Sequence, residues 1–178
     1  MKMKLKKRTA FISSLLVLGC ASPRAAENSI PNRLIDYPGY LKIAQQVQAP
    51  RERRRVTEEQ FITMATQPAT IILDARSESK FKLRHIKGAL NLPFTEFTES
   101  TLAKAIPTKN TRVLIYCNNN FFGSPAAFAG KAAAASLNIS TYVTLTSYGY
   151  TNIYELGPLI EIKSTKLVFE GEEVSRAR

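Results

Sequence analysis

Short apolar runs alternate with polar segments from residue 56 onward, and this alternation predicts the order of the elements. The runs at 70–74 and 112–116 are rich in β-branched and large apolar residues, which is typical of strands buried on both faces. A third run at 89–93 ends at a proline and predicts another strand, and 141–146 predicts a last one. The segments between them predict helices at 57–66, 77–83, 102–106, 126–137 and 152–156.

The start of the regular alternation carries a helix signal. Thr57 is followed three places later by Gln60, a capping-box pattern that opens a helix, and Pro68 comes after its predicted end. Before this point, the apolar positions between residues 34 and 47 predict a turn followed by an accessory helix outside the main domain. Pro50 and the charged run 51–55 mark the boundary of this region, and we expect the run to be a solvated surface segment, with a binding patch as the alternative.

Alternating strands and helices predict an α/β fold of three layers, with a central parallel sheet flanked by helices. The chain has 178 residues, which is enough for one globular domain with extensions. In such sheets the ligand lies beyond the carboxyl ends of the strands. The predicted organisation is a signal peptide at 1–20, a linker and accessory helix at 21–52, the main domain at 53–160 and a C-terminal extension at 161–178.

The first residues are typical of an export signal. Five of the 25 Lys and Arg residues lie in the first eight positions, ahead of an apolar run at 10–19 that is too short to cross a membrane. The end of this run, Leu-Val-Leu-Gly-Cys20, resembles a bacterial lipobox, and Ala21 after the cysteine favours an outer-membrane anchor. An ordinary signal peptide cut after Ala21 is the alternative. Both predict an exported, periplasmic protein whose membrane contact is limited to a lipid on Cys20.

The formal net charge of +11 raises the question of nucleic-acid binding. Without the five N-terminal charges, 20 basic residues face 14 acidic ones, an excess of six. No segment alternates basic and aromatic residues in the way that base stacking would need. We therefore expect no nucleic-acid partner.

Cys20 and Cys117 are the two cysteines of the chain, and Cys20 is either lipidated or removed with the signal. The mature protein therefore has a single thiol and no internal disulfide, in a compartment where thiols tend to oxidise. Cys117 comes directly after the strand at 112–116, at the edge of the sheet where ligands bind. Such a thiol is either buried and inert or chemically active.

The segment after Cys117 favours an active thiol. The seven residues that follow it are the candidate substrate-binding loop: Asn118, Asn119, Asn120, Phe121, Phe122, Gly123 and Ser124. Asparagine and glycine tolerate unusual backbone angles, while Ser124 and Pro125 suit the N-cap and first position of a helix. A strand, a tight loop and a helix N-terminus would hold the sulfur over unpaired N–H groups that favour the thiolate.

Four segments within residues 57–158 together resemble the rhodanese-like family. Leu73-Asp74-Ala75-Arg76 is similar to the family's Asp-Val-Arg strand end, and 85–93, which begins with His85, is similar to its His-Ile-x-Gly-Ala-x-Asn-x-Pro segment. Val113 to Cys117 resembles the active-site strand and its cysteine, and 145–150 resembles the Leu-x-Gly-Gly stretch before the last helix. The resemblance implies the rhodanese-like three-layer fold.

It also implies sulfur transfer. Cys117 would attack a small sulfur-containing donor, form a cysteine persulfide, and pass the outer sulfur to a thiol acceptor. No metal and no organic cofactor is implied; a protein partner and the oligomeric state stay open. By the same resemblance Asp74, Arg76 and His85 are supporting, structural residues, with a general-base role for His85 as the alternative.

The loop departs from the family pattern. Family loops commonly carry Arg or Lys and Gly two or three places after the cysteine, where this chain has Asn119 and Asn120, in a loop one residue longer. No Arg lies between Cys117 and Pro125 to grip an oxyanion, which disfavours the related phosphatase chemistry. The neutral, partly aromatic loop suggests an organic persulfide or polysulfide donor. The alternatives are a non-catalytic module that binds a partner or small anion, and a thiol redox or sulfide-sensing role.

Overall fold

The computed structural model describes residues 30 and 32–175. The chain divides into one unit up to Leu34 and a second from Ile35 onward. In the described part of the first unit, the Leu34 N–H donates a hydrogen bond to Asn32 Oδ1 over 2.9 Å. The predicted signal peptide at 1–20 and its Cys20 lie outside the described residues.

The second unit is built on a five-stranded sheet in which every pair of neighbours is parallel, in the order β1-β7-β5-β2-β4. Its two longest strands, β2 (Thr70–Asp74) and β5 (Arg112–Tyr116), lie side by side at the centre and pair along their whole lengths. The other three are β1 (Arg55–Val56), β4 (Leu90–Asn91) and β7 (Ile153–Leu156). This arrangement confirms the predicted α/β fold with a central parallel sheet.

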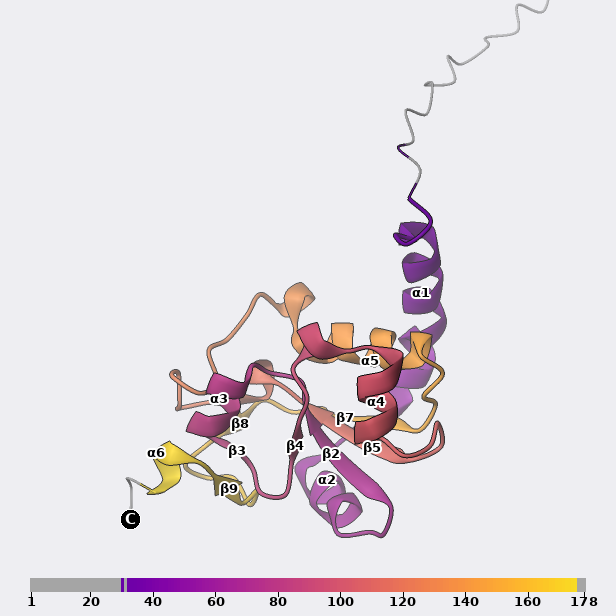
Figure 1. Ribbon diagram of the computed structural model, residues 1–178. Helices are drawn as coiled ribbons and strands as arrows, with labels where there is room; N and C mark the ends of the chain where they lie inside the picture. Colours follow the sequence, from indigo (N-terminus) through magenta and orange to yellow (C-terminus); the bar gives the residue numbers. More distant parts are fainter. Residues whose placement is uncertain (1–29, 31, 176–178) are drawn as a thin grey trace, which may run out of the picture. The chain divides into compact units, whose positions relative to one another are not determined.

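Helices cover both faces of the sheet (Figure 1). One face packs against α1 (Tyr37–Arg53), α4 (Glu99–Ala105) and α5 (Leu137–Ser147), through a core that includes Val113 and Ile115 of β5. The other face packs against α2 (Glu58–Ala65), through a core that includes Leu114 and Tyr116. Alternate residues of β5 therefore serve opposite layers, as the pleat of a strand requires.

Short elements complete the domain. The remaining helices are α3 (Glu78–Leu83) and α6 (Glu172–Ser175), with 3₁₀ turns at Phe94–Glu96, Asn118–Asn120 and Ala133–Ala135. Two small ladders lie outside the main sheet: β3 (His85–Ile86) pairs antiparallel with β9 (Phe169–Glu170), and β6 (Phe121–Phe122) pairs parallel with β8 (Ile160–Glu161). The C-terminal tail thus joins the core, where Leu167 and Phe169 are buried.

The first half of the predicted element order is confirmed. Strands β2 and β5 occupy the predicted residues, and α2, α3 and α4 lie where the patterns place them. The capping box at the start of α2 is present: Thr57 Oγ1 accepts from the Gln60 N–H, and Gln60 Oε1 accepts from the Thr57 N–H over 2.9 Å.

The second half of the predicted order is wrong. Residues 126–132 form no helix, 141–146 belong to helix α5, and 152–156 hold strand β7. An Ala-rich segment has high helix propensity but no large apolar face to bury, and propensity alone rarely holds a helix in water. The β-branched run is helical because Tyr142, Val143 and Leu145 pack against the sheet, which overrides its local strand preference. The stretch 145–150 therefore leads into β7 and not into a last helix.

The accessory helix extends past Pro50 into the charged run. Helix α1 runs through Pro50 to Arg53, and its Asp36 cap accepts a hydrogen bond from the Gly39 N–H over 2.8 Å. The charged run after Pro50 is more than a solvated segment, because Arg51 forms a 2.7 Å ion pair with Glu155 of β7, a residue only 4% exposed. Helix α1 is thereby fixed to the sheet by a largely buried charge pair.

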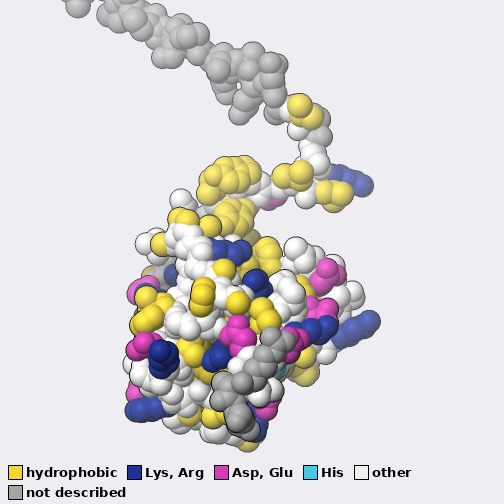
Figure 2. Space-filling model, turned by 90° about the vertical axis from the view of Figure 1, so that its left-hand side faces the viewer, with side chains coloured by type: hydrophobic (Ala, Val, Ile, Leu, Met, Phe, Trp, Pro, Cys, Tyr) yellow, Lys and Arg dark blue, Asp and Glu magenta, His cyan; other side chains and the backbone are white. Residues whose placement is uncertain are grey.

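The surface carries charges of both signs. On the face shown in Figure 2, Lys and Arg side chains are interspersed with Asp and Glu and form no continuous basic stripe. Within the described residues, no helix combines the length and the apolar character needed to cross a membrane.

Candidate functional site

Cys117 lies directly after β5, at the carboxyl end of the central strands. Its side chain is on the sheet face covered by α5, and the residue is only 1% exposed. The Sγ atom lies 3.5 Å from the Oγ atom of Ser136. Ser136 is the N-cap residue of α5, and its hydroxyl makes no capping hydrogen bond to the helix backbone. That hydroxyl is thus oriented toward the thiol instead of the helix.

A helix N-terminus does face the thiol, but it is not the predicted one. Ser124 and Pro125 start no helix; the turn there is closed by a hydrogen bond that the Phe128 N–H donates to the Ser124 carbonyl. The chain runs on for the whole of segment 121–136 before α5 begins at Leu137. The unpaired N–H groups of the first turn of α5 and the helix dipole favour negative charge at this end. The helix that begins beside the thiol is therefore α5, through its N-cap residue Ser136.

Asn118 and Asn119 hold the far part of this segment close to Cys117. Asn118 is buried, and its amide donates to the carbonyl of Ala129 over 2.8 Å. Asn119 makes two hydrogen bonds to one residue: its amide donates to the Lys131 carbonyl (2.9 Å), and its side-chain oxygen accepts from the Lys131 N–H (3.0 Å). These amides therefore fold the segment back over the carboxyl end of the sheet.

Asn120 joins Cys117 to two other elements. Its side-chain oxygen accepts from the Cys117 N–H over 2.9 Å and from the Asn138 amide of α5 over 3.0 Å. Its own amide donates to the Leu156 carbonyl at the end of β7 over 2.7 Å and to the Pro158 carbonyl over 3.3 Å. One buried side chain thus fixes the backbone of Cys117 relative to α5 and β7.

The two phenylalanines of the predicted loop belong to another part of the molecule. Phe121 is buried, and its ring packs against Phe128 and Phe169 with centroid separations of 4.6 and 5.3 Å. Phe122 is 47% exposed and pairs with Glu161 in the small β6–β8 ladder. Phe121 therefore stabilises the core layer opposite α5, the layer away from the thiol.

Ser124, after Gly123, contacts the C-terminal part of the chain. Gly123 has a φ of +91°, a conformation that favours glycine. The Ser124 hydroxyl donates to Glu173 Oε2 over 2.6 Å, and the same carboxylate pairs with Arg84 over 3.2 Å. Arg84, which stands where the family has a glycine, thus pairs with the tail helix. Of the seven predicted loop residues, Asn120 is hydrogen-bonded to Cys117, and five others line one further cleft: Asn118, Asn119, Phe121, Phe122 and Gly123.

Asp74 and Arg76 form a buried pair at the end of β2. The guanidinium donates to both carboxylate oxygens, at 2.9 Å from Nε and 2.5 Å from Nη2, and neither residue exceeds 2% exposure. The Tyr116 hydroxyl donates to Asp74 Oδ2 over 2.5 Å. Burial acts to lower the pKa of Arg76, but hydrogen bonds and the charge of Asp74 outweigh it and raise that pKa. Burial, and next the charge of Asp74, raises the pKa of Tyr116 well above its usual value.

Arg76 also contacts segment 121–136, which we call the returning segment because it leads back to the carboxyl end of the sheet. Its Nη1 donates to the Ala127 carbonyl over 2.9 Å, and its guanidinium lies 4.3 Å from the centre of the Phe128 ring. Arg76 therefore holds residues 127–128 in place, and its charge is compensated by Asp74.

His85 lies among structural contacts. Its Nδ1 is 2.8 Å from the Phe81 carbonyl, its ring stacks on the Phe81 ring at 3.7 Å, and its Nε2 is 3.8 Å from Glu170. None of these partners contacts Cys117 through a hydrogen bond found in residues 32–175. In the same part of the chain, no three His, Cys, Asp or Glu side chains gather in a way that could hold a metal ion.

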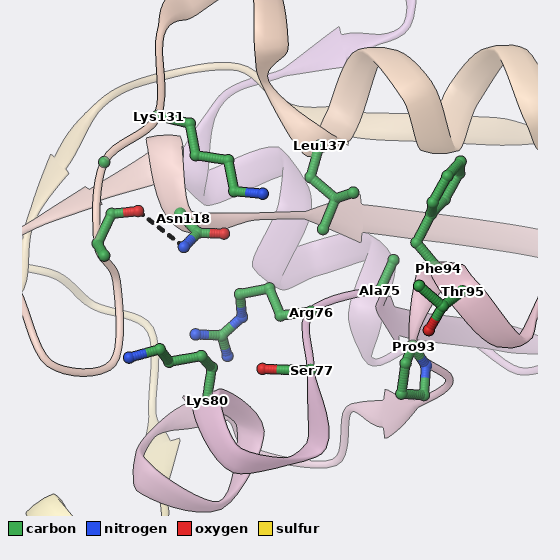
Figure 3. A pocket seen from close by; sticks show the side chains of 12 residues that line it. Ala75, Arg76, Ser77, Lys80, Pro93, Phe94, Thr95, Asn118, Lys131 and Leu137 are labelled. Atoms are coloured by element: carbon green, nitrogen blue, oxygen red, sulfur yellow. Dashed lines mark hydrogen bonds between the residues drawn. The ribbon is translucent and has the colours of Figure 1, made fainter.

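A cleft of about 470 Å³ opens beside Asn118, the neighbour of Cys117 (Figure 3). It is lined by Ala75, Arg76, Ser77, Lys80, Pro93, Phe94, Thr95, Asn118, Ala129, Gly130, Lys131 and Leu137. In Figure 3, Arg76, Lys80 and Lys131 lie toward one end, and Ala75, Pro93 and Phe94 lie toward the other. The cleft adjoins Cys117 through Asn118, while Cys117 itself is not among the lining residues.

Lys80 and Lys131 are functional candidates that the sequence patterns did not identify. Lys131 is the one basic residue between Cys117 and Ser136, so a signal was present in the sequence. The predicted helix at 126–137 gave no reason to place Lys131 beside the cleft. The loop of residues 118–124 is itself neutral, and segment 121–136 brings a lysine to the cleft beside it.

This chain is similar to several known proteins in sequence and in fold. A family model described as the rhodanese-like domain matches residues 57–156. Over 95 residues the sequence is 30% identical to the thiosulfate sulfurtransferase PspE of Escherichia coli. The aligned residues make up 53% of this chain and 76% of that protein. Among solved structures, a rhodanese with anions from E. coli is 22% identical, with a TM-score of 0.40 over 58% of this chain and 99% of that one. A rhodanese-like domain from Anabaena is 20% identical, with a TM-score of 0.48 over 69% and 83% of the two chains.

Proposed function

The chain belongs to the rhodanese-like domain family, and from this premise we propose that it is a sulfurtransferase that carries sulfane sulfur as a persulfide on Cys117. The observation that carries the proposal is the position of the Cys117 Sγ, at the carboxyl end of β5 and 3.5 Å from the Ser136 hydroxyl at the start of α5. A thiol facing a hydroxyl and a helix N-terminus is suited to act as a thiolate nucleophile.

The proposed reaction has two steps. The Cys117 thiolate attacks the outer sulfur of a donor R–S–SH; the new S–S bond forms as the donor's own S–S bond breaks, giving Cys117–S–SH and R–S⁻. With thiosulfate as donor, the leaving group is sulfite and the product is the Cys117–S–S⁻ anion. An acceptor thiolate then takes the outer sulfur and restores Cys117. Ser136 and the N-terminus of α5 stabilise the sulfur anions in both steps.

We further propose that the protein acts outside the cytoplasm, in the periplasm. The support is the basic and apolar pattern of the first 20 residues, and a lipid on Cys20 would be its membrane anchor. Its partners in this proposal are the small sulfur donor and the thiol acceptor. Intact mass of the protein isolated from cell membranes and from the soluble envelope fraction tests both points.

A second candidate function is supported by the burial of the thiol. Cys117 is 1% exposed and does not line the cleft, whereas Lys80 and Lys131 do. A non-catalytic module that binds a small anion in the cleft would have this arrangement, with Cys117 as a buried small hydrophobe.

Sulfur loading of Cys117 distinguishes the two functions. The purified domain is treated separately with thiosulfate and with glutathione persulfide, and intact mass is compared before and after. A sulfurtransferase gains the mass of one sulfur atom, which is lost again with a thiol acceptor and never appears in the Cys117→Ser variant. If neither donor adds sulfur while the folded wild-type protein still reacts with a small alkylating reagent, the enzyme proposal is wrong and the binding module is favoured.

A further inference from the structure

The cleft beside Asn118 has an uncompensated positive charge. Arg76, Lys80 and Lys131 line it, and its twelve lining residues include no Asp or Glu. Arg76 is neutralised by Asp74. Lys80 donates its Nζ hydrogen to the Ala126 carbonyl over 2.6 Å, which satisfies a hydrogen bond without cancelling the charge. Two lysine charges therefore remain to attract an anion.

Lys131 is held beside the cleft by its backbone. The two hydrogen bonds between Asn119 and Lys131 fix the N–H and the carbonyl of Lys131, and two residues earlier the Ala129 carbonyl accepts from Asn118. Its side chain is exposed, and no ion pair of its Nζ is found in the part of the chain that the structure describes. A positioned backbone with an unpaired ammonium group at its tip is suited to bind a ligand carboxylate.

The rest of the cleft is apolar. Ala75, Pro93, Phe94 and Leu137 contribute hydrocarbon surface, and the first three lie at the end away from the basic side chains (Figure 3). The volume of about 470 Å³ lies within the ~300–1,000 Å³ typical of clefts for small organic molecules. An inorganic ion such as thiosulfate has too few atoms to contact the lysines and the apolar end together. The ligand that fits both ends is an organic anion.

We infer that this cleft binds a low-molecular-weight organic thiol or persulfide that carries carboxylate groups, with Lys80 and Lys131 as its specificity-determining residues. The inference rests on the proposed function for its chemistry: the ligand is R–S–SH when it donates to Cys117 and R–S⁻ when it leaves. Two residues of the cleft are chain neighbours of the thiol and its partner, because Asn118 directly follows Cys117 and Leu137 directly follows Ser136.

Binding without sulfur transfer tests the inference separately from the function. The probe is S-methylglutathione, which has two carboxylates and no reactive thiol, titrated into the Cys117→Ser protein by NMR. We expect Lys131→Gln and Lys80→Gln each to weaken binding about threefold to fivefold, and the double variant about tenfold or more, because both charges act on one ligand. Added salt should weaken binding further.

Two controls test whether binding depends on the cleft lysines and on the carboxylates of the probe. Lys104→Gln removes the charge of an exposed lysine on α4 that does not line the cleft, and it should bind as the parent protein does. The diethyl ester of S-methylglutathione keeps the shape of the probe and loses its negative carboxylates, so it should bind weakly and equally to all variants.

The titration with S-methylglutathione decides whether the cleft binds an organic anion through its lysines. Equal affinity of the parent and both lysine variants, or no binding of S-methylglutathione at all, overturns the inference. Lysine-dependent binding supports it, even in a protein that fails to accept sulfur from any donor; such a failure would count against the proposed function alone.

Discussion

The Sγ atom of Cys117 lies 3.5 Å from the hydroxyl of Ser136, the N-cap residue of α5. Because this hydroxyl makes no bond to the helix backbone, its removal should change the thiol and leave the helix intact. We expect Ser136→Ala to slow alkylation of Cys117 by iodoacetamide at neutral pH about threefold to tenfold, the loss of one weak hydrogen bond to a charged sulfur. Ser147→Ala, at the other end of α5, is the control. Equal alkylation rates in the two variants would show that Ser136 does not act on the thiol.

The buried pair of Asp74 and Arg76 should dominate the stability of the site. Asp74→Asn leaves the Arg76 guanidinium buried without a counter-charge, so we expect the free energy of unfolding in urea to fall by about 3–5 kcal/mol. Glu78→Gln removes an exposed ion pair with Lys82 and should change the midpoint little. A loss in Asp74→Asn no larger than in Glu78→Gln would contradict the assigned role of the pair.

The free energy of unfolding should fall at alkaline pH, because Tyr116 is held protonated in the folded state. Burial raises the pKa of Tyr116 in the folded state, while in the unfolded state it is near its ordinary value of about 10. Above that pH the folded state binds more protons than the unfolded state, so the free energy of unfolding decreases as pH rises. Tyr116→Phe should make this decrease shallower without abolishing it, because burial also raises the pKa of Tyr142. Urea midpoints from pH 8 to 11 measure the slope. An unchanged slope in Tyr116→Phe, with exposed Tyr37→Phe as the reference, would refute the assignment.

Asn119 should protect the returning segment from proteolysis. Asn119→Ala removes both side-chain hydrogen bonds that fix the Lys131 backbone, so trypsin should cut after Lys131 several times faster under native conditions. Mass spectrometry of the fragments gives the rate at each site, and cleavage after Lys104 serves as an internal reference. Asn152→Ala removes another amide-to-backbone bond, to Asn110, and should leave the Lys131 site unchanged. Equal cleavage of the parent and Asn119→Ala would mean that other contacts hold the segment.

The elements that could be predicted are those that local signals determine. Strands β2 and β5 are apolar runs bounded by polar residues, and the Thr57 capping box is complete within four residues. Helix α5 and strand β7 could not be identified in this way. Five of the 11 residues of α5 are β-branched, and the helix is stable because its apolar side chains pack against the sheet face formed by Val113 and Ile115.

The candidate site was predictable to the same extent. Cys117 and the asparagines after it follow a clear strand, so their place at the edge of the sheet could be predicted. Ser136 and Lys131 reach that edge from the far end of a long segment, held by hydrogen bonds from Asn118 and Asn119. Residues that reach a site through such tertiary contacts leave no local pattern in the sequence by which they could be predicted.

Asn120 has a consequence for the order in which the protein is made. Its side chain joins Cys117 to Asn138, Leu156 and Pro158, so the surroundings of the thiol are complete only when residues up to Pro158 have been synthesised and have docked. Until then the newly made chain presents an unshielded cysteine to any oxidant it meets. The folded domain buries that cysteine to 1% exposure. The docking of α5 and β7 is therefore the step of folding that completes the shield around this thiol.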